Sequence, residues 1–249
     1  MTDRDGASRG TFAEFTPAAA HDYDAWFDRP WGAHAWAVEL AAVDDALPDR
    51  PDQTVVEVGC GTGRLIAHLT KRAATVVGVD SSPAMLAVAT GRAPGRLVCA
   101  DGRRLPFPDG VADVAITIAT LEFADAAAVL EEMARITRPG GRIIALTLNP
   151  VSPWGLLDRP TRRAPFSTAA FLTRSELRRL GSRHGRARLA GRLFTSAQPG
   201  LRRLEPIATV VGAGVPWFGA VQVLVVDRPI RRCGRDLVRF SRPGNTAVG

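Results

Sequence analysis

Val55–Asp80, VVEVGCGTGRLIAHLTKRAATVVGVD, is the stretch that decides the fold of this chain. Its first four residues include three valines, a β-branched run typical of a buried parallel strand. Gly59, Gly61 and Gly63 follow, and three residues without Cβ atoms let the backbone turn sharply and approach a ligand closely. Residues 65–69 have helical spacing, and residues 75–79 start a second strand that ends at Asp80. The stretch therefore predicts a strand–turn–helix–strand unit of a doubly wound α/β sheet.

The glycine turn and Asp80 should face one crevice, because ligands of such sheets bind at the carboxyl ends of the strands. The spacing is G-x-G-x-G, whereas the dinucleotide fingerprint is G-x-G-x-x-G, and position 64 is arginine. Glu57 precedes the turn, and a carboxylate there suits an ammonium and a sulfonium better than a pyrophosphate. Asp80 can accept hydrogen bonds from both hydroxyls of a ribose.

The pattern E-x-G-x-G-x-G followed by V-x-G-x-D resembles motif I and the acidic loop of class I S-adenosylmethionine-dependent methyltransferases. Residues 135–146, RITRPGGRIIAL, resemble the segment after the motifs of that family, and residues 51–150 carry the likeness most strongly. Ala20–Trp36 looks like the N-terminal segment of small-molecule methyltransferases in the group that includes quinone-biosynthesis enzymes. The resemblance implies a Rossmann-like, doubly wound α/β fold with a seven-stranded, mostly parallel sheet, an N-terminal helical segment and an inserted lid.

The resemblance also implies a site for S-adenosylmethionine. Asp80 would hold the ribose, Asp101 the adenine amino group, and the backbone of Thr117 and Ile118 would lie beside the methionine moiety. Tyr23 would close over the cofactor, and Met85 would either touch it or pack in the core. The full set of predicted cofactor-binding residues is Tyr23, Glu57, Gly59, Gly61, Gly63, Asp80, Ser81, Met85, Asp101, Gly102, Thr117 and Ile118.

The acceptor site is less defined, because methyl transfer from a sulfonium needs a general base only when the acceptor must lose a proton. Glu122, after the fourth strand, and His21 are the candidate catalytic residues, and a structural role is the alternative for each. An apolar acceptor pocket and ordinary core packing are the two interpretations of the aromatic residues Trp26, Phe27, Trp31, Trp154 and Trp217. We predict no metal, because the sequence shows no cluster of metal ligands.

Composition limits the other classes of protein. The chain has 249 residues, of which 46% are hydrophobic, and no apolar run is long enough to span a bilayer. No signal peptide is visible, and three scattered cysteines without a metal pattern indicate a reducing cytoplasm. Cys60 and Cys99 fall on predicted buried elements. Residues 1–150 carry a net charge of −6 and residues 151–249 of +13, which favours either an anionic partner or a solvated basic surface.

The predicted organisation has three parts. Residues 1–10 form a disordered N-terminus, residues 11–228 the methyltransferase domain, and residues 229–249 a basic C-terminal tail. Within the domain, residues 51–150 form the core and residues 150–215 the lid or substrate region. The later part should contain a capped helix over residues 173–184, a strand at 186–194, a helix at 201–211 and an antiparallel strand at 218–226.

The predicted function is methyl transfer from S-adenosylmethionine to a small-molecule acceptor. Three alternatives remain: an RNA or protein methyltransferase, a nicotinamide-dependent reductase, and a catalytically silent cofactor-binding protein. No N-P-P-Y or D-P-P-Y motif and no cysteine follows the fourth strand, so methylation of adenine amino groups or of pyrimidine C5 is disfavoured. Nucleic acid is therefore disfavoured as a partner, and the oligomeric state is open.

Overall fold

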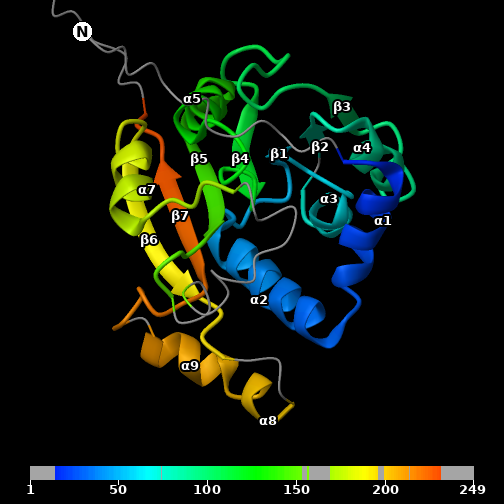
Figure 1. Ribbon diagram of the computed structural model, residues 1–249. Helices are drawn as coiled ribbons and strands as arrows, with labels where there is room; N and C mark the ends of the chain where they lie inside the picture. Colours follow the sequence, from blue (N-terminus) through cyan, green and yellow to red (C-terminus); the bar gives the residue numbers. More distant parts are fainter. Residues whose placement is uncertain are drawn as a thin grey trace, which may run out of the picture.

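A single seven-stranded sheet organises the computed structural model, which describes residues 15–73, 75–152, 156, 169–195, 199–212 and 214–230. The strand order is β3-β2-β1-β4-β5-β7-β6, and β7 runs antiparallel to both of its neighbours (Figure 1). This confirms the predicted fold class. The strands are β1 (Thr54–Val58), β2 (Thr75–Asp80), β3 (Leu97–Cys99), β4 (Ala112–Ile118), β5 (Thr137–Leu148), β6 (Arg186–Arg192) and β7 (Val221–Asp227).

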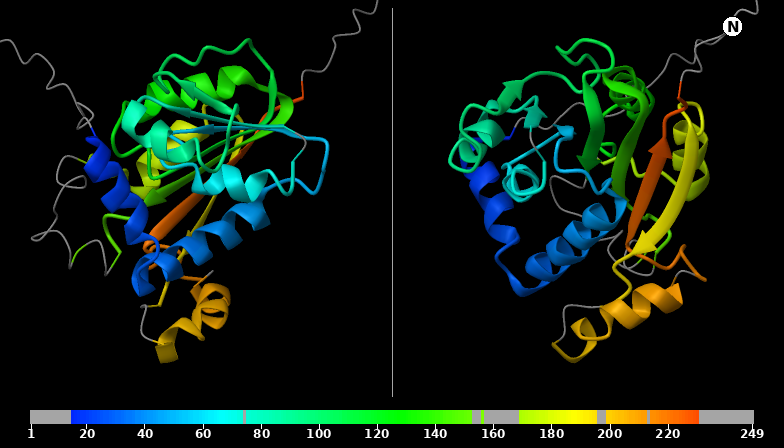
Figure 2. Two further views of the ribbon diagram at one scale, coloured as in Figure 1. Left: turned by 90° about the vertical axis from the view of Figure 1, so that its right-hand side faces the viewer. Right: turned by 180° about the vertical axis from the view of Figure 1, so that it is seen from behind.

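Helices cover both faces of the sheet. The described helices are α1 (Pro17–Trp26), α2 (Pro30–Ala46), α3 (Arg64–Leu69), α4 (Pro83–Ala89), α5 (Ala126–Ile136), α7 (Arg174–Gly181), α8 (Pro199–Arg202) and α9 (Glu205–Gly212). One hydrophobic cluster joins α2 and α3 to the sheet, and a second joins α5 and α7 to its other face. Helix α1 lies beside α4, and Figure 2 shows α8 and α9 outside these layers.

The alternation of side chains along each strand creates the two clusters. Val55 of β1 belongs to the α2 cluster and Val56 to the α5 cluster, since neighbouring residues of a strand point to opposite faces. The same alternation separates Ile116 from Ala115 on β4. Both faces are therefore buried, which is why β1 and β4 are mostly apolar. The carboxyl ends of these two strands border the site described below.

Several boundaries differ from the predictions. The fifth strand, expected over residues 142–148, begins at Thr137, because that residue pairs with Ala112 across an irregularity in the ladder. The predicted helix over residues 201–211 is divided into α8 and α9. The helix expected over residues 173–184 ends at Gly181. The expectation that Cys99 is buried was wrong, since β3 is the edge strand and the residue is exposed, whereas Cys60 is buried.

Some predictions lie outside the described residues. They concern the N-terminus over residues 1–10, Trp154, the parts of the lid region at residues 153–155, 157–168, 196–198 and 213, and the tail beyond residue 230. In the part of the chain that the structure describes, no helix combines the length and the apolar character needed to cross a bilayer.

The predicted capping box at the start of α7 is confirmed and can be tested. The Thr173 hydroxyl accepts the N–H of Glu176, and the Glu176 carboxylate accepts the N–H of Thr173. Thr173→Ala should lower the free energy of unfolding by about 1 kcal/mol, because the N–H of Glu176 loses the hydroxyl that accepts its hydrogen bond. Chemical denaturation measures the change. Thr173→Ser keeps the hydroxyl and is the control; equal losses in both variants would contradict a role for the cap.

Candidate functional site

The glycine turn after β1 is fixed against the end of β2. The N–H groups of Gly59 and Cys60 both donate to the carbonyl of Val79, at 2.7 and 2.9 Å. Gly59 has a φ of +74°, and a Cβ there would overlap the side chain of Thr120. At Gly61 the nearest atom to an added Cβ is a ring carbon of Tyr23, 4.0 Å away. The first glycine is thus required by packing, and the second keeps the space in front of the turn open.

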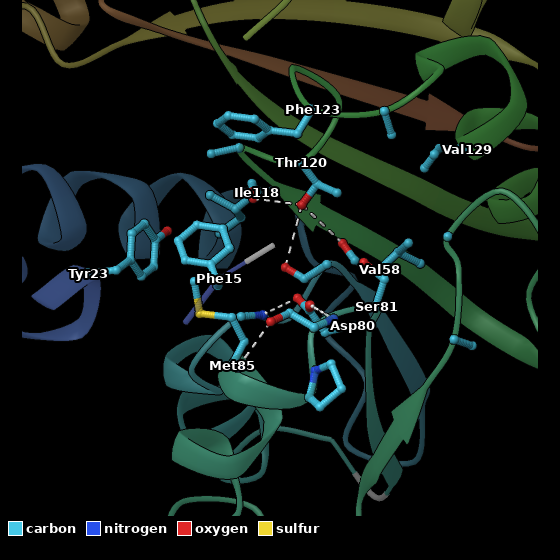
Figure 3. A pocket seen from close by; sticks show the side chains of 18 residues that line it. Phe15, Tyr23, Val58, Asp80, Ser81, Met85, Ile118, Thr120, Phe123 and Val129 are labelled. Atoms are coloured by element: carbon cyan, nitrogen blue, oxygen red, sulfur yellow. Dashed lines mark hydrogen bonds between the residues drawn. The ribbon is translucent and has the colours of Figure 1, made fainter. Parts of the chain in front are cut away.

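Asp80 connects this turn to α4. One carboxylate oxygen accepts the N–H of Gly61 and the other accepts the N–H of Ser82, both at 2.8 Å (Figure 3). Burial raises the pKa of Asp80, and these backbone hydrogen bonds oppose the rise. Each oxygen has further lone pairs, so the carboxylate remains able to accept hydrogen bonds from a ligand.

A cavity of about 430 Å³ opens at this edge of the sheet. Its wall comes from α1, from the ends of β1, β2 and β4, and from the first turn of α4 (Figure 3). Ala119, directly after β4, has a φ of +49°, a strained conformation of the kind that gathers at ligand sites. The lining residues include Phe15, Tyr23, Val58, Gly59, Gly61, Asp80, Ser81, Ser82, Met85, Gly102, Ile118, Ala119, Thr120 and Phe123.

A second cavity of about 960 Å³ continues from the first toward α1 and α2. The two share Phe15, Tyr23, Gly59, Gly61, Ile118 and Ala119. The larger cavity is also lined by Trp26, Phe27, Trp36, Glu39 and Glu57. The site therefore has two connected compartments, and Tyr23 stands in the wall of both.

Glu57 supplies a buried carboxylate with one unpaired oxygen to this site. The residue is 3% exposed, and its Oε2 atom has no hydrogen-bond partner among the residues that the structure describes. Burial raises its pKa well above the usual range, the charge of Asp80 adds to the rise, and the N–H of Ile66 opposes it. A buried acceptor without a partner is costly, so a cationic or N–H donor group of a ligand is the natural complement.

Helix α1 is held over the cavities by Asp24. Its carboxylate accepts hydrogen bonds from Arg64 and Arg92, at 2.7 Å each, and from the hydroxyl of Thr62 at 2.8 Å. Burial alone would raise the pKa of Asp24, but these donors lower it to about 2. Arg64 also binds Asp28 at 3.0 Å. One carboxylate therefore ties the helix that carries Tyr23 to α3 and to the loop after α4.

The comparisons with known proteins agree with this geometry. A family described as a methyltransferase domain matches residues 56–145. Over these residues the chain is similar to a methyltransferase domain. Its fold and glycine motif resemble those of class I S-adenosylmethionine-dependent methyltransferases, which confirms the resemblance.

Curated relatives include the demethylmenaquinone methyltransferases of Thermus thermophilus and Mycobacterium tuberculosis. They are 41% identical over 117 and 104 residues, which is 44% and 41% of this chain and 53% and 44% of the relatives. The chain thus spans about half the length of the curated relatives it matches. The similarity includes the quinone-biosynthesis group that the N-terminal segment suggested.

Solved structures share the fold over most of the chain. A methyltransferase of Thermotoga maritima, described as a possible histamine N-methyltransferase, has a TM-score of 0.68 at 23% identity and covers 85% of this chain and 96% of its own. Geranyl diphosphate C-methyltransferase from Streptomyces coelicolor has a TM-score of 0.57 at 22% identity, covering 76% and 77%. At these identities the likeness concerns the fold.

The structure gathers most of the predicted cofactor residues at the two cavities. Those that line one or both are Tyr23, Glu57, Gly59, Gly61, Asp80, Ser81, Met85, Gly102 and Ile118. Gly63, with a φ of +76°, caps α3, and the buried hydroxyl of Thr117 donates to the carbonyl of Val58 at 2.7 Å. Asp101 lies outside both linings, and its carboxylate is paired with Arg103 at 2.7 Å. An adenine contact for Asp101 stays a prediction.

The two candidate catalytic residues lie away from the cavity linings. His21 is exposed on α1. Glu122 is 1% exposed, and its Oε1 accepts the N–H of Leu148 at 2.6 Å. Burial raises the pKa of Glu122 to about 7, although the N–H of Leu148 opposes the rise. A catalytic role for either stays a prediction.

Sequence reasoning missed Phe15, Trp36, Glu39, Thr120 and Phe123 as lining residues. Glu39 carried a usable signal, because it is the one charged residue in the apolar stretch AWAVELAAV over residues 35–43. Trp26 and Phe27 do line the larger cavity, as one interpretation held. Trp31 packs against the α2 core cluster, and Trp217 is 50% exposed.

The Asp24 contacts predict a pH-dependent contribution to stability. Asp24→Asn should lower the free energy of unfolding by about 1.5–3 kcal/mol at neutral pH, because it removes a charged acceptor from two arginines. Since the pKa is depressed in the folded protein, this difference should be complete above about pH 4 and should disappear as the pH falls toward 2. Denaturation at several pH values measures it.

Asp28→Asn is the matched control, because Asp28 is 71% exposed and bonds to Arg64 alone among these partners. It should change the free energy of unfolding by less than about 1 kcal/mol. An equal effect of both variants would show that Asp24 contributes no more to stability than an exposed ion pair does.

Proposed function

We propose that this protein transfers a methyl group from S-adenosylmethionine to a small-molecule acceptor. The observation that carries the proposal is the pair of carboxylates, Glu57 and Asp80, at the two ends of an open glycine turn. The family match over residues 56–145 and the curated relatives support the same activity. Demethylmenaquinone methyltransferases act on small molecules, and that supports a small-molecule acceptor here.

The residues present fit this cofactor. Asp80 is placed to accept hydrogen bonds from two ribose hydroxyls, and the unpaired Oε2 of Glu57 fits an ammonium group. Met85 and Ile118 give the smaller cavity an apolar wall. When bound, S-adenosylmethionine supplies an electrophilic methyl group with a good leaving group. The protein therefore has to align the acceptor and exclude water.

Tyr23 is suited to separate donor and acceptor. It lines both cavities, and its ring packs edge-to-face on Phe27 with centroids 5.3 Å apart. Burial and the surrounding carboxylates raise its pKa, so the hydroxyl stays neutral and can donate a hydrogen bond. With α1 held by Asp24, Tyr23 is kept in the wall that the two cavities share.

The alternatives are less well supported. The carboxylates of Glu57 and Asp80 would repel the pyrophosphate of a nicotinamide cofactor. The larger cavity is lined by Asp22, Glu39 and Glu57 and by two arginines, of which Arg64 is already paired with Asp24 and Asp28. This lining disfavours RNA as the acceptor. Cys60 and Cys99 are free thiols, which supports our proposal of a reducing cytoplasmic location.

A thermal-shift titration with S-adenosylmethionine, S-adenosylhomocysteine and NADH in parallel tests the proposal. Saturation about a hundredfold above the dissociation constant should stabilise the protein by about 2.7 kcal/mol. We expect the first two ligands to raise the melting temperature and NADH to leave it unchanged. Binding of both without methyl transfer to any acceptor would support the silent cofactor-binding alternative.

Asp80→Ala should weaken the binding of S-adenosylhomocysteine by about 1.5–3 kcal/mol, roughly 10- to 150-fold, because it removes a charged acceptor for the ribose. Isothermal titration calorimetry measures the change. Asp80→Asn keeps one acceptor oxygen and should lose less affinity. Unchanged affinity in the alanine variant would remove Asp80 from the site.

A further inference from the structure

Glu39 is a carboxyl group that cofactor binding leaves unexplained. Glu39 of α2 lines the larger cavity, whereas Asp80 lines the smaller one, and Tyr23 lies in the wall of both. Among the residues that the structure describes, no hydrogen bond or ion pair reaches its carboxylate. An unpaired carboxyl group in the apolar stretch over residues 35–43 is costly to keep, so a ligand that pairs with it is expected.

The wall around Glu39 is aromatic. Trp36 lies one helical turn before Glu39, so both occupy the same face of α2. Phe27 contacts Tyr23, Trp26 and Trp36 edge-to-face, with centroid separations of 5.3, 5.0 and 5.5 Å. These rings hold one another in place, and aromatic faces beside a carboxylate suit a positively charged nitrogen.

The charges around the cavity favour the same ligand. The carboxylates of Glu39, Asp80, Glu57 and Glu122 all raise the pKa of Tyr23, and Glu39 has the largest effect among these charges. The positive charge of Arg64 is taken up by Asp24 and Asp28, and its guanidinium lies 5.1 Å from the centre of the Phe27 ring. Asp22 and Arg29 also line this cavity, and both are exposed. The described lining residues therefore offer an anionic acceptor no buried cation that is not already paired.

We propose that the larger cavity binds an acceptor with a basic amine on an apolar or aromatic body, and that Glu39 pairs with the nitrogen to be methylated. This inference rests on the proposed methyltransferase function and names its substrate class. It also agrees with the protonation behaviour of Glu39. Burial and the nearby Glu122 raise the pKa of Glu39 to about 8, so the free group holds a proton readily, and an ammonium partner favours its charged form.

The chemical step balances with these groups. The acceptor ammonium gives one proton to the Glu39 carboxylate, which becomes a neutral carboxyl group. The freed nitrogen lone pair then forms the N–C bond as the S–C bond of the sulfonium breaks, and sulfur keeps the bonding electron pair. The methylated amine leaves as an ammonium ion, and Glu39 returns its proton to solvent.

Binding of a matched series of probes tests this assignment. 2-Phenylethylamine, 2-phenylethanol and 3-phenylpropanoate share an aromatic body and differ in charge. Each is titrated by calorimetry into the protein saturated with S-adenosylhomocysteine. We expect the amine to bind about tenfold or more tightly than the alcohol, and the acid more weakly than both. Equal affinities, or no binding of the amine, would overturn the amine assignment.

Glu39→Gln keeps the shape of the side chain and removes its charge. It should weaken amine binding by about tenfold or more and change alcohol binding by less than about twofold. Asp49→Asn removes an exposed acidic charge after α2 and should behave as the wild type. An amine preference that survives in Glu39→Gln would remove Glu39 from the acceptor site.

Binding of S-adenosylhomocysteine separates the two hypotheses. The Glu39→Gln variant should keep its affinity for this ligand within about twofold, which also shows that it is folded. Saturable binding together with no amine preference would overturn the amine assignment alone. If the wild-type protein does not bind S-adenosylhomocysteine, the proposed function itself fails.

Discussion

The site depends on one link between two strands: the N–H groups of Gly59 and Cys60 share the carbonyl of Val79. This link brings the end of β1 against the end of β2, and Asp80 then closes it by accepting the N–H of Gly61. The turn is compatible with this position because Gly59 has no Cβ to overlap Thr120. Both cavities border this turn, so its geometry sets where any ligand can lie.

The N-terminal helices α1 and α2 complete the walls of the cavities at the edge of the sheet. A strand edge alone leaves a shallow crevice, and α1 and α2 turn it into two connected cavities. Asp24 fixes the position of α1, because its carboxylate joins this helix to Arg64 of α3 and to Arg92 after α4. Residues far apart in sequence therefore share the wall around Tyr23.

The site gathers buried acidic side chains, although the net charge of the chain is positive. The net charge of the protein is +7, and most of the basic excess lies in residues 151–249. The cavities instead collect Glu39, Glu57 and Asp80 from the acidic first half. Buried carboxylates act at short range in a medium of low dielectric constant, whereas exposed arginines are screened by water and salt. The local carboxylates, rather than the net charge, therefore decide which ligand is favoured.

The sequence by itself determined the α/β unit around the glycine turn and the residues of that turn, because β-branched runs, glycine spacing and caps such as Thr173 act over a few residues. The seven-stranded sheet with its antiparallel strand was implied by the resemblance of these motifs to class I methyltransferases. Only the tertiary structure decided the rest. Asp101 pairs with Arg103, Glu122 turns toward the backbone of Leu148, and Glu39 enters the acceptor cavity. The direction and the partners of a side chain depend on how distant elements pack, and no pattern along the chain records that packing.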